Sequence, residues 1–467
     1  TMLCIILLFF VKFSTNLYTV DAVWHAYKED KVPDAKYNCP AHGTQEYLEE
    51  NKLQTKAVSD ENKKRWKLWP DVVSTDDIAG GETMYGFEVG MEAIWKNQHP
   101  EDCSKAKFLF SGGFESGFAS EFHVVGSGLA LALELGRVYM MIPDAMRSGI
   151  ATKMDSANRW QVDNPHCRKQ NNTNLDCFFE PWSSCTFEDA IKGTSLKNLR
   201  GKGLLVPYNE INKDRAKYES LRTVIAHLSP EVQDFIPSQL RKLVECSPFS
   251  PNKYRYWWRS ISVAYLLRPN PATLQLFQLH RRDREQMFDR EKEKCVSVYI
   301  RRGDKHLEMP LIMNETVFFE GAKGLWDNIP NHDQQKRPVM FVGSEDPEVI
   351  DSALTWGVEN NWRILYSNLF DRRSVSAYLN ATEQAAHRVS GTFKTDEWEY
   401  FSMILNLDAH LRCSAFVGTM RSNSCRLVDE FRATVGAKAH RPYADYTCFD
   451  SHTRGPCIDS ERISIDW

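Results

Sequence analysis

Apolar and polar residues alternate along this chain in segments that predict strands followed by helices. The first segment holds an apolar run up to Phe110, a glycine-rich turn, and a stretch in which apolar residues recur at helical spacing. The apolar face of this predicted helix consists of Phe118, Phe122, Val125, Leu129 and Leu133. A second apolar run, RVYMMI, follows, so residues 107–142 predict a βαβ unit with its glycine-rich turn at the start of the helix.

The second half of the chain repeats this strand–helix order. Apolar runs at 337–344 and 362–367 predict strands, and a helix between them is expected to have Ser344 as its N-cap and Pro347 in its first turn. The later elements are a helix within 397–413, a strand at 414–419 and a helix within 422–436 that stops at Gly436. This alternation indicates an α/β protein with parallel sheets that helices cover on both faces.

The amino-terminal residues are first apolar and then polar. Residues 2–11 form an apolar run shorter than the ~20 residues of a transmembrane helix. The VDA that ends at Ala22 fits a cleavage site, so a cleaved signal peptide and a membrane anchor both stay open. The expected organisation is a signal peptide or anchor (1–23), a polar, solvated stalk (24–67), an N-terminal α/β domain with the glycine loop and the acceptor side (68–285), a C-terminal Rossmann-like domain (286–447) and a tail (448–467).

Cysteines and glycosylation sequons point to an oxidising compartment. All but one of the 12 cysteines lie beyond the amino-terminal apolar run, and N-x-S/T sequons occur at Asn171, Asn314 and Asn380. These features predict the Golgi or the secretory-pathway lumen, with membrane attachment only through an N-terminal anchor. The odd number of remaining cysteines predicts at least one free thiol.

Three cations follow a predicted buried strand in CVSVYIRRGDK. The net charge of −4 gives no basic field for nucleic acid, so a cationic site must be local. Arg301, Arg302 and Lys305 come just after the strand, where parallel sheets bind ligands. Guanidinium groups hold phosphate oxygens bidentately and lysine adds a compact charge, so the set fits the diphosphate of a nucleotide sugar. For Arg302, an ion-pair cluster with Asp304 and Asp283 is an equal alternative.

Four motifs, in this order, resemble those of the α-1,6-fucosyltransferases, glycosyltransferase family 23. DCSKA followed by GFASEFH is similar to the family's DCSKA and GYGCQLH, and YWWRSISVAYLLRPNP resembles its tryptophan pair and YLIRPQP segment. YIRRGDK stands where the family has HVRRTDK. FVGTMRSNSCRLVDEF is similar to the strand, loop and helix of the family's VCTFSSQVCR. The resemblance covers roughly residues 102–431.

The resemblance implies a GT-B-type fold of two Rossmann-like domains with parallel sheets. It implies inverting transfer of fucose from GDP-fucose without a metal or other cofactor. Arg301 would hold the donor β-phosphate, with Arg302, Lys305 and Asp304 around it, Asp304 as the orienting partner of an arginine. Glu308, in the loop after the strand, would accept the proton of the acceptor hydroxyl.

The remaining expected donor contacts come from other motifs. Gly117 would approach the diphosphate, and Ser422, with Thr419 in the same motif, would help hold the nucleotide. The chain departs from the family at three places. Tyr299 replaces a histidine, Ala119 replaces the second loop glycine, and Asn406 stands where an aspartate that reads guanine is expected, with Asp408 two residues later.

The expected acceptor is a glycan, most simply the core GlcNAc of N-glycans in α-1,6 linkage. Two alternatives stay open: a protein O-fucosyltransferase, and an inactive secreted glycan-binding protein of the same fold. The sequence contains no C-x-x-C, H-E-x-x-H or D-x-D motif, so no zinc site and no manganese clamp is expected.

The resemblance also implies a disulfide, and two further features are interpreted from the residues themselves. Cys103 and Cys185 match the two ends of a family disulfide, and Cys448 with Cys457 is a weaker pair. For residues 256–258 (YWW), packing in the core is favoured over stacking on a sugar. For His123, a hydrogen bond within the fold and a contact with substrate both stay open.

Overall fold

The structure is a computed structural model. It describes residues 37–41, 43–69, 82–111, 118–141, 177–192, 205–207, 221–227, 236–249, 253–285, 293–302, 314–329, 331–367, 399–420, 422–439, 442–449 and 456–458. Residues 40–467 form one compact unit and residues 1–39 another. The expected boundary near residue 285 falls inside the larger unit and stays a prediction.

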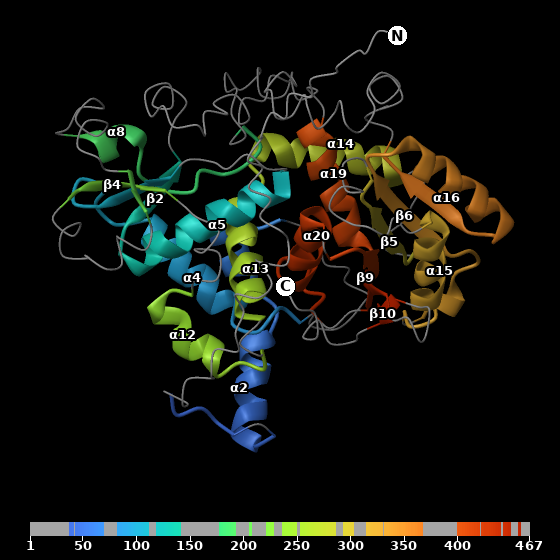
Figure 1. Ribbon diagram of the computed structural model, residues 1–467, viewed down its shortest axis with the longest axis horizontal. Helices are drawn as coiled ribbons and strands as arrows, with labels where there is room; N and C mark the ends of the chain where they lie inside the picture. The colour runs from blue at the N-terminus through green and yellow to red at the C-terminus, as the bar shows by residue number, and fades with distance from the viewer. Residues whose placement is uncertain are drawn as a thin grey trace, which may run out of the picture. The chain divides into compact units, whose positions relative to one another are not determined.

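A four-stranded parallel sheet forms in the first half of the larger unit (Figure 1). Its strands, in the order β2-β1-β4-β3, are β1 (Phe108–Ser111), β2 (Val138–Met141), β3 (Leu205–Pro207) and β4 (Thr223–His227). Helix α5 (Phe118–Glu134) joins β1 to β2. Side chains alternate between the faces of β1: Leu109 packs into the main core with α5, whereas Phe108 and Phe110 pack toward α8 (Phe187–Ile191). The predicted βαβ unit is therefore confirmed.

A six-stranded sheet forms in the second half, in the order β10-β9-β8-β5-β6-β7. Its strands are β5 (Val296–Ile300), β6 (Val339–Ser344), β7 (Arg363–Tyr366), β8 (Ala415–Gly418), β9 (Tyr443–Phe449) and β10 (Pro456–Ile458). All neighbouring pairs are parallel except β9 and β10. The predicted α/β class, with two parallel sheets, is confirmed.

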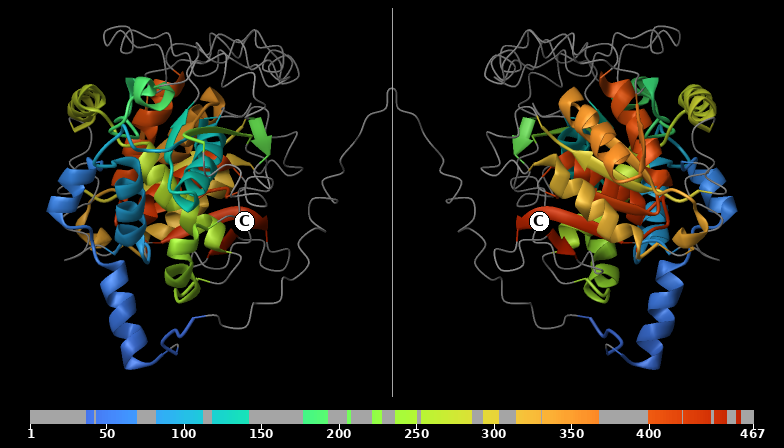
Figure 2. Two further views of the ribbon diagram at one scale, coloured as in Figure 1. Left: turned by 90° about the vertical axis from the view of Figure 1, so that its left-hand side faces the viewer. Right: turned by 90° about the vertical axis from the view of Figure 1, so that its right-hand side faces the viewer.

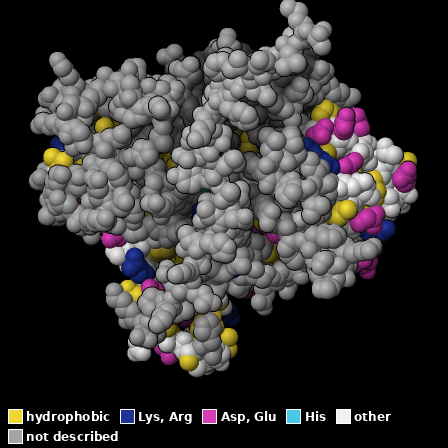
Figure 3. All heavy atoms as spheres, in the orientation of Figure 1, with side chains coloured by type: hydrophobic (Ala, Val, Ile, Leu, Met, Phe, Trp, Pro, Cys, Tyr) yellow, Lys and Arg dark blue, Asp and Glu magenta, His cyan; other side chains and the backbone are white. Residues whose placement is uncertain are grey.

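Helices cover both faces of the six-stranded sheet (Figure 2). One face packs against α15 (Glu315–Trp326) and α16 (Pro347–Glu359) through Val296, Val298 and Ile300. The other packs against α19 (Glu399–Arg412) and α20 (Asn423–Ala433). The exposed faces of α15 and α16 gather acidic side chains (Figure 3), including Glu320, Asp327 and Glu348.

The larger unit contains further described helices. They are α2 (Gln45–Thr55), α3 (Asp60–Trp66), α4 (Phe87–Gln98), α12 (Ser238–Glu245), α13 (Tyr254–Leu266), α14 (Pro271–Glu285) and the short 3₁₀ helix η5 (His332–Gln334). The largest core cluster includes Phe122 of α5, Trp258 of α13 and Phe431 of α20, so helices from both halves of the unit meet in it, whereas α15 and α16 pack in a separate cluster. Among the described residues, no helix is long and apolar enough to span a membrane.

Two predicted helix ends are wrong. The N-cap of α16 is Asp346, whose side chain accepts from the backbone N–H of Glu348, while Ser344 ends β6 and donates its hydroxyl to the carbonyl of Ile300 at 2.8 Å. Pro347 does occupy the first turn. Helix α20 ends at Ala433, because the N–H of Gly436 already turns back to the carbonyl of Phe431.

The polar segment, expected to be a solvated helix or stalk, is helical, but its carboxyl end is not solvated. Residues 45–66 form two helices, and the Trp66 side chain that ends the second is fully buried. Val58, Leu68 and Trp69 join the same core. Single apolar residues in a strongly polar stretch give no periodic signal, so only the packing reveals that they anchor the segment.

The aromatic run at 256–258 is core, as interpreted. Trp257 and Trp258 are at most 1% exposed, and each indole N–H donates to a backbone carbonyl, of Tyr85 and Gly126 respectively, at 2.7 and 2.8 Å. Buried tryptophans usually find such a partner for their one polar atom. Sugar stacking on these rings is excluded by their burial.

A disulfide lies beside each of the two sheets. The Cys103–Cys185 bond is confirmed, with Cα atoms 5.5 Å apart. A second bond, Cys295–Cys413, connects the start of β5 to the end of α19 and was not anticipated from the sequence. Cys425 is a buried free thiol, as the odd cysteine count predicts. The side chains of Cys448 and Cys457 lie outside the described part of the chain.

Removal of the Cys103–Cys185 bond, as the double alanine variant, should lower the free energy of unfolding by about 2–5 kcal/mol. The bond closes a long loop of the unfolded chain, since its ends are 82 residues apart. Urea denaturation, monitored through tryptophan fluorescence, measures this difference in the free energy of unfolding. A variant as stable as the wild type would show that the bond does not contribute.

Candidate functional site

The candidate site lies at the carboxyl edge of the six-stranded sheet. Arg301 and Arg302 directly follow β5, Glu345 directly follows β6, and the segment from Thr419 to Ser422 follows β8. Because β5 pairs in parallel with both β6 and β8, these three segments leave the sheet side by side. Ligands of parallel α/β sheets bind at such an edge.

Glu345 holds the backbone and the guanidinium that follow β5. Its carboxylate pairs with Arg301 Nη1 and accepts a hydrogen bond from the backbone N–H of Arg302 at 2.5 Å. The side chain of Arg301 is 18% exposed and that of Glu345 only 9%. The carboxylate therefore orients Arg301 at the rim of the sheet. Sequence reasoning missed Glu345, although its position after a strand end mirrors that of Arg301.

Arg302 pairs with Glu315 at the start of α15. The distance from Nη2 to Oε2 is 2.6 Å. Partial burial raises the pKa of Glu315, but hydrogen bonds from its own backbone N–H and from Ser352, together with the charge of Arg302, lower it more. Glu315 therefore stays ionised at neutral pH. The ion-pair alternative for Arg302 is correct in kind, with Glu315 as a partner among the described residues. The predicted pairing with Asp304 and Asp283 stays a prediction, because their side chains lie outside the described residues.

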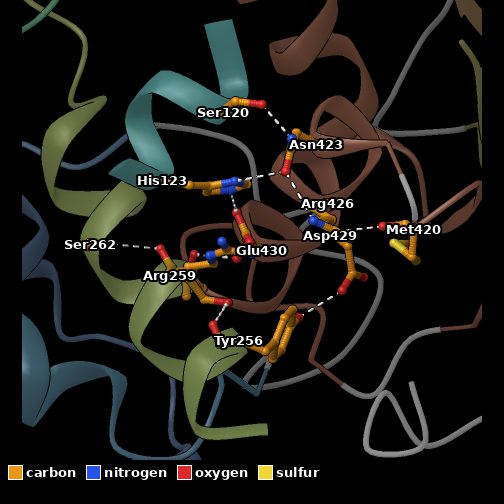
Figure 4. Close-up of polar contacts among 12 residues, drawn as sticks. Ser120, His123, Tyr256, Arg259, Ser262, Met420, Asn423, Arg426, Asp429 and Glu430 are labelled. Carbon is orange, nitrogen blue, oxygen red and sulfur yellow. Dashed lines mark hydrogen bonds and ion pairs between the residues drawn. The ribbon is translucent and has the colours of Figure 1, made fainter. Parts of the chain in front are cut away.

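The N-termini of α5 and α20 meet, and that of α20 lies against the end of β5. Ser422, 1% exposed, is the N-cap of α20, and the side chains of Asn423 and Ser120 hydrogen bond between the first turns of α20 and α5 (Figure 4). Cys425 Sγ lies 3.6 Å from the carbonyl oxygen of Tyr299, which places this end of α20 against the end of β5. Helix N-termini carry partial positive charge and attract anions.

Arg426 adds a fixed positive charge to this end of α20. Its Nε donates to the carbonyl of Met420 at 2.6 Å and its Nη1 to Asn423 Oδ1 at 3.1 Å (Figure 4). Burial lowers the pKa of Arg426 to about 10, with smaller opposing contributions from nearby charges. The group is therefore still cationic at neutral pH. Met420 is itself held by its N–H, which donates to Asp445 at 2.8 Å.

The donor-binding residues expected on β5 and α19 separate into two groups. Tyr299 lies beside His410, with ring centroids 5.5 Å apart, and burial raises its pKa so that the hydroxyl stays protonated. Asn406 is one helical turn before His410 and shares its face of α19. Asp408 instead is buried and pairs with the partly buried Arg412 at 3.2 Å. Asn406 is therefore better placed than Asp408 to act together with Tyr299.

Several expected site residues lie outside the described residues. They are Gly117, Asp304, Lys305 and Glu308. Thr419 is described and buried, and its carbonyl accepts from the N–H of Ser422 at 2.8 Å. His123 makes the internal hydrogen bonds that its first interpretation foresaw, to Glu430 and Asn423. Within the described ranges, no cluster of three or more potential metal ligands occurs.

Comparisons with known proteins return fucosyltransferases among solved structures. No protein-family model and no curated protein matches the chain. The NodZ α-1,6-fucosyltransferase soaked with GDP-fucose shows 12% identity over 74% of this chain and 96% of its own, at a TM-score of 0.38. A variant of FUT1 from Arabidopsis thaliana in complex with GDP shows 9% identity over 92% of this chain and 86% of its own, at a TM-score of 0.39. POFUT1 in complex with GDP shows 12% identity over 74% of this chain and 100% of its own, at a TM-score of 0.34. All three TM-scores lie below 0.5, so the fold assignment depends on the two sheets themselves.

Proposed function

We propose that this protein is an inverting, metal-independent glycosyltransferase that moves fucose from GDP-fucose to a glycan. The observation that carries the proposal is the convergence of Arg301 and Arg302 with the N-terminus of α20 at one edge of a parallel sheet. This convergence supplies the cations and N–H donors that a diphosphate needs. The RRGDK sequence at this edge adds the resemblance to the fucosyltransferase family.

The expected site residues have proposed roles toward the donor and the acceptor. Arg301, oriented by Glu345, neutralises the charge that develops on GDP as the glycosidic bond breaks. Ser422 and the first turn of α20 hold a phosphate, and Tyr299 with Asn406 contacts the base. Lys305, Asp304 and Gly117 complete the diphosphate site, and Glu308 accepts the proton of the acceptor hydroxyl.

The proposed acceptor is the core GlcNAc of N-glycans, in α-1,6 linkage, on the strength of the motif resemblance. A protein O-fucosyltransferase is the alternative within enzymes, and an inactive glycan-binding protein is the alternative outside them. The protein is proposed to act in the Golgi or secretory lumen, which the Cys103–Cys185 and Cys295–Cys413 disulfides and the exposed sequon at Asn314 support.

One assay separates these functions. The purified protein is incubated with GDP-fucose and a panel of N-glycans, glycopeptides and folded protein domains, and products are identified by mass spectrometry. Fucose on the core GlcNAc supports the proposal, and fucose on a serine or threonine supports the O-fucosyltransferase. Binding of glycans without release of GDP from GDP-fucose would support the inactive protein.

Fucose transfer should survive the removal of divalent metal ions. In the proposed site, arginines and helix N-termini neutralise the leaving diphosphate, a role that a metal ion plays in many nucleotide-sugar enzymes. Initial rates of GDP release are compared before and after dialysis against EDTA. Loss of activity in EDTA with recovery on addition of manganese would contradict the metal-independent proposal.

A further inference from the structure

A buried polar cluster connects α5 to α20. His123 Nε2 lies 2.8 Å from Glu430 Oε2, and His123 Nδ1 lies 3.2 Å from Asn423 Oδ1 (Figure 4). The amide nitrogen of Asn423 also contacts the Ser120 hydroxyl. His123 is 2% exposed and Glu430 is fully buried. Residues about 300 positions apart in the chain are thus joined by three side-chain contacts.

Stability alone does not account for such a cluster. Buried ionisable pairs gain little over apolar residues of similar volume, because desolvation offsets most of their attraction. Burial lowers the pKa of His123, and Arg259 of α13 and Arg426 of α20 act in the same direction, against the attraction of Glu430. A cluster of directional hydrogen bonds fixes the position of one helix relative to the other, because the bonds form only at one relative position of α5 and α20.

The cluster lies close to the starts of both helices, so it fixes how these two starts are placed relative to each other. His123 lies in the second turn of α5, which begins one residue after Gly117, and Asn423 is the first residue of α20, directly after Ser422. Gly117 is expected to approach the diphosphate, and Ser422 is expected to help hold the nucleotide. In the proposed function, the cluster therefore links the starts of two helices that approach the same donor.

We propose that His123, Asn423 and Glu430 are positioning residues that set the spacing between the starts of α5 and α20, and thereby the affinity for the nucleoside diphosphate of the donor. The inference rests on the proposed function for the identity of the ligand. Misplacement of a binding group by about 1 Å can cost 10- to 100-fold, so loss of the cluster should appear in donor binding.

The test variant is Asn423→Ala. It removes the contacts to Ser120 and His123, and also the hydrogen bond from Arg426, whose guanidinium keeps its bond to the carbonyl of Met420. Asn423 is the partly exposed first residue of a helix, where alanine is well tolerated. Calorimetry should find the Kd for GDP raised about tenfold or more, and the KM for GDP-fucose should rise in parallel while kcat at saturating donor stays within a few-fold. Glu430→Gln, which keeps the shape of the side chain, should show a smaller increase of the same kind.

Tyr256→Phe is the matched control. It removes one buried hydrogen bond, from the Tyr256 hydroxyl to Asp429 at 2.7 Å, that ties α20 to α13 instead of α5. This variant should lose a comparable amount of thermal stability and bind GDP as the wild type does. If it weakens GDP binding as much as Asn423→Ala, the cluster has a general structural role and the inference is overturned.

Hydrogen exchange separates failure of this inference from failure of the proposed function. Asn423→Ala should speed amide exchange in the first turns of both α5 and α20, whereas Tyr256→Phe should affect α13 and α20 only. If wild type binds no GDP, the proposed function fails, and the exchange data still decide whether the cluster couples the helices. Faster exchange in both helices with unchanged GDP affinity would overturn the link to the donor.

Discussion

Replacement of Arg301 by lysine should remove most of the fucose transfer while the protein stays folded. A single ammonium group cannot hold two phosphate oxygens in the fixed geometry that a guanidinium provides. Loss of one preorganised donor to a developing negative charge typically costs about 100- to 1,000-fold in kcat. Steady-state GDP release at saturating GDP-fucose measures the loss, and circular dichroism checks the fold.

Arg363→Lys is a matched control in the same sheet. Arg363 begins β7 and pairs with Glu293 at 2.6 Å, at the edge opposite to Arg301. It makes a similar ion pair without facing the candidate site, so its lysine variant should keep the wild-type rate. Wild-type turnover by Arg301→Lys as well would assign Arg301 a structural role in its pair with Glu345.

Replacement of Glu308 by glutamine should abolish transfer and leave GDP affinity unchanged. Inverting displacement needs a base that takes the proton of the acceptor hydroxyl as the sugar C1 is attacked, and a carboxylate serves this role. The amide keeps the shape of the side chain but cannot accept the proton. Calorimetry with GDP, together with a transfer assay on whichever acceptor the panel of glycans and proteins identifies, measures the two quantities separately.

The control for Glu308 is Glu348→Gln, which neutralises an exposed carboxylate in the first turn of α16, near the same edge of the sheet. It should transfer fucose at the wild-type rate. Transfer by Glu308→Gln within a few-fold of wild type would exclude Glu308 as the base. The search would then turn to Asp304 or to Glu115, a carboxylate in the glycine-rich turn before α5.

The sequence alone determined the order of the elements and the edge at which chemistry is expected. Periodicity is a local property, because it depends on which residues of one strand or helix face the core. The apolar face of α5, the strand ending at Ile300 and the cations after it were therefore predicted from neighbouring residues. Cys103 and Cys185 were paired through the motif resemblance, and the structure joins them.

Only the tertiary structure decided which side chains meet. Glu345 beside Arg301, Glu315 beside Arg302, and the Cys295–Cys413 bond each join separate elements, and no spacing in the sequence encodes such a contact. The same is true of the burial of Trp66 at the end of a polar segment. His123 and Glu430 are the extreme case, since they are 307 residues apart and face each other only because α5 and α20 pack together. Local pattern predicts each helix and its inward face, but the partner of a polar side chain depends on the register between helices, which packing of the whole core sets.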